Sequence, residues 1–174
     1  MNLDDILLSD NVVECINNNL DYLLVLVPEI QYMIGFDQKH PHHHLDVWNH
    51  TLLALSLSQN DFDIRLCLLL HDIGKPFSYQ EGEVRHFKGH AETSSKIARV
   101  ILKRLDYPSD YIEYICYLVL YHDTPITDDF IKNNRELAIK LYKIQYCDAL
   151  AHNPLKLEKR KEYLDSVQKR LLMK

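Results

Sequence analysis

Histidines and aspartates that suit metal binding stand at the ends of apolar segments of this chain. Ten of the 174 residues are histidines. His71 and Asp72 follow the apolar run Leu66–Leu70, His50 begins another apolar segment, and Asp148 stands late in a third. Neutral imidazoles and carboxylates are ligands that suit zinc, iron, manganese and similar divalent ions. A buried aspartate is costly unless it is paired or bound to a metal, so these residues indicate a metal site.

The segments that must position these residues have the apolar spacing of α-helices. Only four glycines are present, which argues against an all-β sandwich or barrel with many turns. Residues 78–87, around Gly82, alternate in character and predict a short hairpin or an ordered loop. We therefore expect an all-α fold, a single-domain helical bundle in which several helices supply the ligands of one ion. Apolar residues recur at three- and four-residue steps in Ile6–Leu20, Tyr22–Ile34, Val47–Leu57, Ile64–Leu70, Ile97–Leu105, Tyr111–Tyr121, Leu137–Leu150 and Leu155–Leu172.

The charge and the cysteines limit the classes of function. Lys and Arg number 20 and Asp and Glu 25, a net charge of −5, which disfavours a protein that binds duplex nucleic acid. No apolar run reaches the ~18 residues of a membrane span, and no signal peptide is visible. The four cysteines form no C-x-x-C pair, so we expect reduced thiols in a cytoplasmic protein without membrane contact.

The charge is also unevenly distributed along the chain. Residues 1–38 contain seven acids and no Lys or Arg, whereas residues 154–174 contain seven bases and three acids. We interpret the two segments as solvated helical faces. The alternative is a basic C-terminal segment that steers an anionic substrate.

Four motifs in this order resemble the HD superfamily of metal-dependent phosphohydrolases. They are H-H-L-D-V-W-N-H-T-L at 43–52, H-D-I-G-K-P at 71–76, H-F-K-G-H at 86–90 and Y-C-D-A at 146–149. They look most like the HD domains of bacterial tRNA nucleotidyltransferases and poly(A)-polymerase-related proteins. The resemblance implies an HD domain of the helical-bundle type over residues 38–153, with N-terminal helices over 1–37 that pack on the core and a C-terminal helix over 154–174. Because 37 residues leave no room for a nucleotidyltransferase part, we expect only the hydrolytic domain.

The resemblance also implies which residues bind metal. The matching ligands are His50, His71, Asp72 and Asp148. His90 and His122 fall where some HD proteins supply ligands for a second metal, so we expect them near a second ion or the substrate phosphate. The cofactor would be one or two divalent ions, Mn, Fe, Ni, Co, Zn or Mg. With two ions, Asp72 would bridge them, because a carboxylate has two oxygens.

Further residues are expected to contact the substrate. Lys75 follows Asp72 by three residues, and its ammonium could neutralise a phosphate oxygen. The alternative is a surface lysine near a helix C-terminus. Asp72 and Lys75 are the predicted catalytic residues, and the predicted substrate-binding residues are Lys75, His86 and His43. We expect His40 and His42 at the surface and His152 at a helix end.

The function implied by the resemblance is hydrolysis of a phosphate ester by metal-activated water. The substrate would be a small phosphorylated molecule, a nucleotide or an RNA end, and a monoester, a cyclic diester and a triphosphate all stay open. The alternatives are a non-catalytic metal-holding regulatory or RNA-end-binding module, a di-iron oxygenase of the same fold, and a helical scaffold whose metal site serves stability. The apolar segment Tyr22–Ile34 would either cover the core or form the face of a homodimer.

Overall fold

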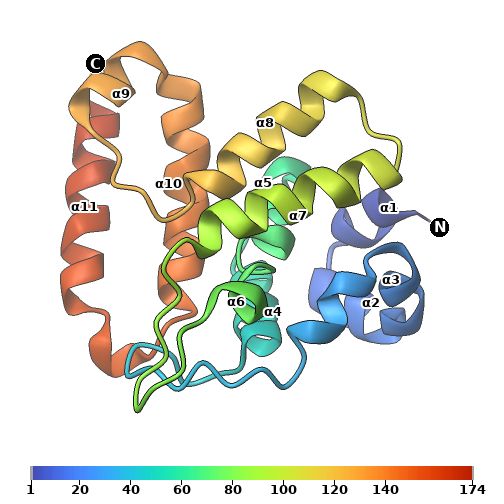
Figure 1. The fold of residues 1–174 in the computed structure, drawn as a ribbon. Helices are drawn as coiled ribbons and strands as arrows, with labels where there is room; N and C mark the ends of the chain where they lie inside the picture. Colours follow the sequence, from blue (N-terminus) through green and yellow to red (C-terminus); the bar gives the residue numbers. More distant parts are fainter. Residues whose placement is uncertain (1, 174) are drawn as a thin grey trace.

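The computed structural model describes residues 2–173, and within that range it contains helices and loops but no strand. This confirms the expected all-α class. The α-helices, drawn in Figure 1, are α1 (Leu3–Leu7), α2 (Val12–Asn18), α3 (Leu20–Leu26), α4 (Val47–Ser56), α5 (Phe62–Leu70), α6 (Lys75–Ser78), α7 (His90–Arg104), α8 (Ser109–Leu120), α9 (Asp128–Asn133), α10 (Arg135–Leu150) and α11 (Glu158–Leu172). Two short 3₁₀ helices, η1 (Pro28–Tyr32) and η2 (Pro154–Lys156), join them.

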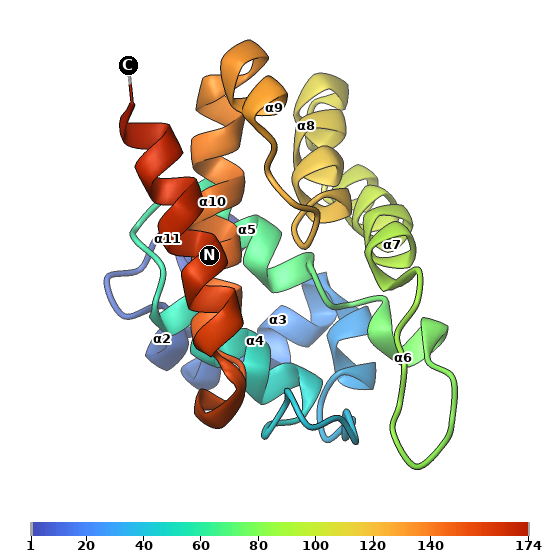
Figure 2. The ribbon, with the colours of Figure 1, turned by 90° about the vertical axis from the view of Figure 1, so that its left-hand side faces the viewer.

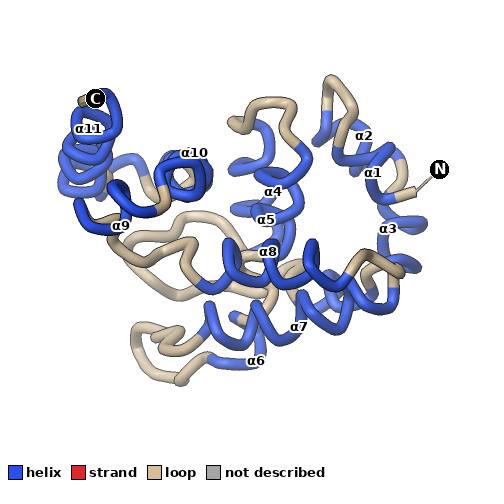
Figure 3. Tube along the Cα trace, turned by 90° about the horizontal axis from the view of Figure 1, so that it is seen from above, coloured by secondary structure: helices blue, strands red, loops and turns tan. Residues whose placement is uncertain are grey.

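Helix α5 occupies the centre of the molecule. Every residue from Ile64 to Leu70 is buried, because α1, α4, α7, α8 and α10 all pack against this helix. Seen from above, α4 and α5 lie between the α10–α11 pair and the N-terminal helices, while the α7–α8 hairpin crosses in front (Figure 3). A helix that is largely apolar around its whole circumference needs such complete cover, and its one buried charge, Arg65, is hydrogen-bonded.

Capping side chains fix where the two central helices begin. Asp61 accepts a hydrogen bond from the Ile64 amide at 3.2 Å, as expected for the start of α5. Asp46 does the same for α4 through the Asn49 amide at 2.7 Å. A cap decides at which residue a helix begins, and so which of its residues face inward. With these caps, His50 is buried near the start of α4, and His71 is the residue directly after α5.

The N-terminal segment differs from the prediction. The expected helix Ile6–Leu20 is divided into α1 and α2, because Asn11 caps a new helix and Arg65 of α5 donates to the carbonyls of Leu7 at 2.6 Å and Ser9 at 2.8 Å. The expected helix Tyr22–Ile34 stops at Leu26, since Pro28 lacks the amide hydrogen needed to continue it.

Residues 78–87 form an ordered loop rather than a hairpin of two strands. A single bridge joins Gln80 and His86, with backbone N–O distances of 2.8 and 3.4 Å. The loop extends below the bundle beside residues 37–46 (Figures 1 and 2). Of the two expected forms, the loop is therefore the one observed.

One hydrophobic core runs through the described chain. It contains residues as far apart as Leu3 near the N-terminus and Leu171 near the C-terminus. The N-terminal helices cover α5 and α4, and α11 packs along α10 through Leu164, Val167 and Leu171. Among residues 2–173, no helix combines the length and the apolar character that crossing a membrane requires.

Candidate metal centre

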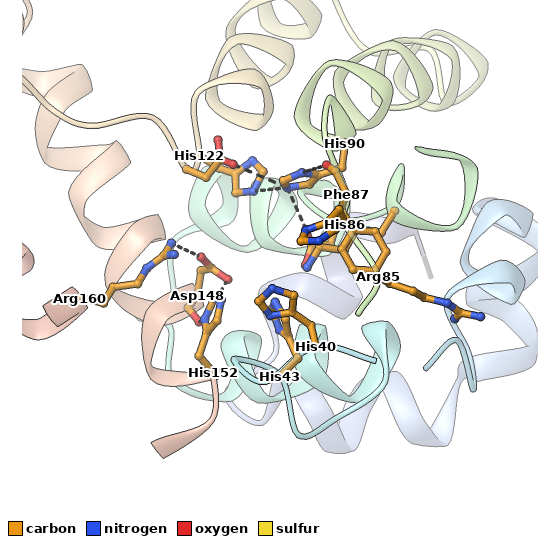
Figure 4. Close-up of a pocket in the computed structure, with 13 residues that line it drawn as sticks. His40, His43, Arg85, His86, Phe87, His90, His122, Asp148, His152 and Arg160 are labelled. Atoms are coloured by element: carbon orange, nitrogen blue, oxygen red, sulfur yellow. Dashed lines mark hydrogen bonds and ion pairs between the residues drawn. The ribbon is translucent and has the colours of Figure 1, made fainter. Parts of the chain in front are cut away.

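The ends of six helices meet around a pocket of about 230 Å³. Its wall comes from the starts of α6 and α7, the ends of α5, α8 and α10, the first turn of α11, and the two loops before α4 and α7 (Figure 4). Phe87 is its one aromatic hydrocarbon side chain. The lining residues are His40, His43, Asp72, Lys75, Arg85, His86, Phe87, His90, His122, Asp123, Asp148, His152 and Arg160.

The four residues predicted as principal ligands lie together at the base of this pocket. Nε2 of His50 lies 3.0 Å from Oδ1 of Asp148 and 3.7 Å from Oδ2 of Asp72. Nε2 of His71 lies 3.2 Å from that Asp72 oxygen and 3.6 Å from Oδ1 of Asp148. All four side chains are buried.

These spacings fit a shared divalent ion. Metal–ligand bonds of about 2.0–2.1 Å put neighbouring ligand atoms roughly 3.0–3.4 Å apart in octahedral or tetrahedral geometry. The buried Nε2 of His71 has no hydrogen-bond partner among the described residues. A buried nitrogen left in that state is expensive, and a metal would satisfy it. The donor set and its spacing therefore suit the expected cofactor.

A second group of ligands lies on the other side of Asp72. Its Oδ1 atom is 3.4 Å from Nε2 of His90, and that nitrogen is 3.3 Å from Nε2 of His122. Asp72, His90 and His122 could hold a second ion, and the two oxygens of Asp72 face the two groups separately. His50, Asp148 and His152 form a third set of potential ligands beside the first.

Backbone carbonyls orient five of the histidine rings. Nδ1 of His71 lies 2.7 Å from the Leu68 carbonyl, and Nδ1 of His122 lies 2.7 Å from that of Val119. Because a carbonyl only accepts, Nδ1 carries the hydrogen and Nε2 is left to face the pocket. In the other three rings Nδ1 also lies near a backbone carbonyl oxygen. The distances are 3.1 Å from His50 to Ala151, 2.9 Å from His90 to Phe87 and 2.7 Å from His152 to Asp148.

The two buried carboxylates control the charge of the centre. Burial alone would raise the pKa of Asp72, but His71, Lys75 and His90 hold it well below its usual value. The pKa of Asp148 is lowered in the same way, against burial, by His152, His50, His71 and Arg160. Both aspartates are therefore anionic, the form that binds a cation.

The pKa values of the buried histidines shift in opposite directions, according to whether the carboxylates or burial and neighbouring positive groups dominate. Burial opposes the charged form of His71, yet Asp72 and Asp148 raise its pKa to about 10. Burial dominates at His122 and His152 and lowers the pKa of each to about 4. The neutral rings of His122 and His152 have a lone pair for a metal, whereas His71 must release a proton before it can bind one.

Lys75 is buried next to Asp72 rather than exposed at the surface. Its Nζ atom is 2.7 Å from Oδ2 of Asp72 and donates to Oε1 of Gln38 at 2.8 Å. That oxygen of Asp72 has no hydrogen bond of normal geometry among the described residues, and the ammonium is its nearest charged partner. The ammonium also lies 5.4 Å from the centre of the Phe87 ring. Lys75 therefore fixes the orientation of the Asp72 carboxylate as well as lining the pocket.

The remaining predicted residues lie at the pocket rim. His43 and His86 both line it, and the His43 ring lies 4.5 Å from that of His152. His40, expected at the surface, also lines the pocket, whereas His42 is exposed. His152 caps the end of α10, as expected, and in addition faces the site.

Two of the charged lining residues that sequence reasoning missed contact predicted site residues. Asp123 follows His122 directly, and its carboxylate is 3.8 Å from Nε2 of His90. Arg160 comes from α11, where it donates to Oδ2 of Asp148 at 2.8 Å. The excess of basic residues after position 154 was the only sign that α11 contributes to the site.

An all-α bundle with imidazoles and carboxylates gathered around one buried Asp72 defines a class of metal-binding helical domains. The family model of the HD domain matches residues 42–158, and this chain belongs to that family. The match includes all six predicted ligand residues.

Several characterised proteins are similar to this chain. The CC-adding tRNA nucleotidyltransferase of Thermus thermophilus is 31% identical over 141 residues, which is 73% of this chain and 32% of that protein. The multifunctional CCA protein of Shewanella denitrificans is 38% identical over 93 residues, 51% of this chain and 22% of its own length. That of Pseudomonas fluorescens Pf-5 is 34% identical over 104 residues, 58% of this chain and 25% of its own. The chain thus spans about a third or less of these relatives.

Proposed function

We propose that this protein is a metal-dependent phosphohydrolase that hydrolyses a phosphate ester of a nucleotide or an RNA end. The observation that supports this most directly is the position of Asp72. It lies between two histidine groups, with Oδ2 facing His71 and Oδ1 facing His90. The residues that would hold one ion are His50, His71, Asp72 and Asp148, and those that would hold a second are Asp72, His90 and His122.

A divalent ion bound there supplies positive charge to a phosphoryl oxygen and makes water a stronger acid. The protein contributes preorganisation, because backbone carbonyls fix the histidine rings and Lys75 fixes Asp72 before the substrate arrives. The Lys75 ammonium has three hydrogens, and Asp72 and Gln38 take two of them. The third is available to a phosphate oxygen at the pocket base.

The size of the pocket favours a terminal phosphate over a fully enclosed nucleotide. At about 230 Å³ it lies below the roughly 300–1,000 Å³ of pockets that enclose whole small ligands. The phosphate and its sugar would enter, and the rest of the substrate would remain outside. The relatives are named as tRNA nucleotidyltransferases and CCA proteins, so an RNA 3′ end is a natural candidate for that outer part.

The proposal is tested by phosphate release from nucleoside mono- and triphosphates, cyclic nucleotides and a short RNA with a phosphorylated end. Each is assayed with Mn²⁺, Fe²⁺, Ni²⁺, Co²⁺, Zn²⁺ and Mg²⁺. We expect turnover with at least one ion and its complete loss in Asp72→Ala. The control is Asp165→Ala, since Asp165 is exposed on α11. Hydrolysis that persists in Asp72→Ala would contradict the proposal, and no turnover with any ion would favour a non-catalytic metal-holding module.

A further inference from the structure

Arg160 connects the C-terminal helix to the candidate metal centre. It is the third residue of α11, and its side chain reaches the pocket with 36% of its surface exposed. The guanidinium donates through Nη2 to Oδ2 of Asp148 at 2.8 Å (Figure 4). The other oxygen of that carboxylate, Oδ1, is the one that faces His50 at 3.0 Å. Arg160 therefore occupies the side of Asp148 opposite the metal ligands.

The guanidinium keeps donors for a second partner. Arginine has five N–H hydrogens in a planar fork, and Arg160 uses one of them in its bond to Asp148. A planar fork matches two oxygens of a phosphate group. Because Arg160 lines the pocket, a phosphate that enters comes within reach of the unused donors.

The two other strongly basic residues of the pocket have more protein partners than Arg160. Lys75 is buried, forms an ion pair with Asp72 and donates to Gln38, which leaves one of its hydrogens for a phosphate. Arg85 donates to Glu81 and to the Asp37 carbonyl, and its guanidinium stacks on the rings of Phe36 and Tyr79 at 4.9 Å from each. In Figure 4 the Arg85 guanidinium points away from Asp148, whereas that of Arg160 points toward it.

We propose that Arg160 is a phosphate-binding residue of this pocket and that it exchanges Asp148 for the substrate phosphate when a divalent cation binds. This inference rests on the proposed function for the nature of the substrate. Without a cation, Asp148 needs a positive partner, and Arg160 provides it. With a cation on Oδ1, the carboxylate is neutralised from the other side, and the guanidinium is free to turn to the more highly charged phosphate.

Two measurements that need no turnover test this exchange, both made on Arg160→Gln in the full chain. Mn²⁺ affinity is measured by equilibrium dialysis, and inorganic phosphate affinity is measured on the Mn²⁺-loaded protein by calorimetry. Loss of charge-assisted hydrogen bonds should weaken phosphate binding about 10- to 100-fold. The guanidinium of Arg160 competes with Mn²⁺ for Asp148. Its removal should therefore strengthen Mn²⁺ binding, by up to about fivefold for a partly exposed ion pair.

The matched control is Arg170→Gln on the same helix. Arg170 forms an ion pair of the same 2.8 Å length with Asp128, but it does not line the pocket. We expect both affinities to stay at the wild-type value in this control. Arg160→Lys, which keeps the charge and loses the fork, should bind phosphate with intermediate affinity. Equal melting temperatures of the two Gln variants would exclude loss of fold as the cause.

Weaker phosphate binding together with stronger Mn²⁺ binding in Arg160→Gln would support the exchange. Weaker Mn²⁺ binding in Arg160→Gln would overturn it, since Arg160 would then support a metal ligand. Unchanged phosphate affinity would overturn it as well. Absence of turnover by the wild-type protein would contradict the proposed function but not the phosphate affinity assigned to Arg160.

Discussion

His50 and Asp148 are 98 positions apart in the sequence, and Nε2 of His50 lies 3.0 Å from Oδ1 of Asp148. The contact joins the start of α4 to the end of α10. The two helices pack against each other and against α5, which brings His71 and Asp72 to the same point. The centre is thus assembled by long-range packing of three helices, and its stability and its metal affinity must be linked.

The first prediction concerns thermal stability. Metal binding to the folded state alone should stabilise the protein by about 2.7 kcal/mol at a Mn²⁺ concentration of 100 Kd. For a chain of this length, that corresponds to a rise in Tm of roughly 5–10 °C. Differential scanning calorimetry with and without Mn²⁺ measures it, and a chelator should reverse it. A Tm that changes with neither Mn²⁺ nor the chelator would argue against an ion at this site.

The number of ions depends on the second histidine group. His122→Ala should lower the Mn²⁺ content by one ion per chain, because His90 and Asp72 alone make a poor site, while His50 and His71 keep the first ion. Elemental analysis of the dialysed, Mn²⁺-saturated protein measures the content. His44→Ala is the matched control, since His44 is exposed and does not line the pocket. If wild type and His122→Ala hold the same number of ions, His122 is not a ligand.

Gly74 allows the start of α7 to approach the turn that carries Asp72. A Cβ at this position would lie 2.5 Å from the Ser94 amide nitrogen and 2.7 Å from the His90 carbonyl oxygen. Backbone atoms must move to relieve such contacts, so Gly74→Ala should cost about 1–3 kcal/mol of unfolding free energy. Urea denaturation measures this loss. Gly82→Ala, in the exposed loop, places its Cβ no closer than 3.2 Å to any atom and should cost less. Equal costs would contradict the close-approach argument.

The cluster of Lys140, Asp61 and Asp63 lies outside the pocket and should make the unfolding free energy depend on pH. Nζ of Lys140 lies 2.7 Å from Asp61 and 3.0 Å from Asp63. Burial tends to raise the pKa of Asp61, but hydrogen bonds from Lys140 and the Ile64 amide lower it overall. A carboxyl whose folded pKa is depressed stabilises the protein above its unfolded pKa and loses this effect as the pH falls through the folded pKa.

Lys140→Met should therefore destabilise the protein by about 1 kcal/mol near pH 7. The difference from wild type should shrink as the pH falls below the ordinary pKa of an aspartate, about 4, because Asp61 then becomes protonated. Urea denaturation at several pH values measures it. A difference that stays constant across this range would show that Lys140 acts through packing of its hydrocarbon chain instead.

Sequence patterns predicted the central helices and the candidate ligand residues at their ends because these depend on local signals. Asp61 is a local cap, and His71-Asp72 follows an uninterrupted apolar run. The division of the N-terminal helix was not predictable in the same way, since Arg65, 58 positions from Leu7, satisfies the carbonyls at the break. Helix α9 was also missed, because its six residues carry too few apolar positions to show a period.

The difference between local signals and long-range packing also explains why some site residues were missed. Arg160 is one of several bases in a solvated helix, and nothing local distinguishes it from Lys159 or Lys161. Only the packing of α11 on α10 brings Arg160 to Asp148. His40 joins the pocket for a similar reason, since its loop lies beside the loop that carries His86.

The carbonyls that orient His71, His122 and His152 belong to the last turns of α5, α8 and α10. Each of these helices therefore uses a carbonyl of its last turn to hold a pocket histidine, and the Asp148 carbonyl also accepts from the Ala151 amide at 3.1 Å. A one-residue insertion or deletion in the final turn would rotate the ring by about 100° around the helix axis and separate it from its carbonyl. The lengths of these three helices should consequently tolerate no indels.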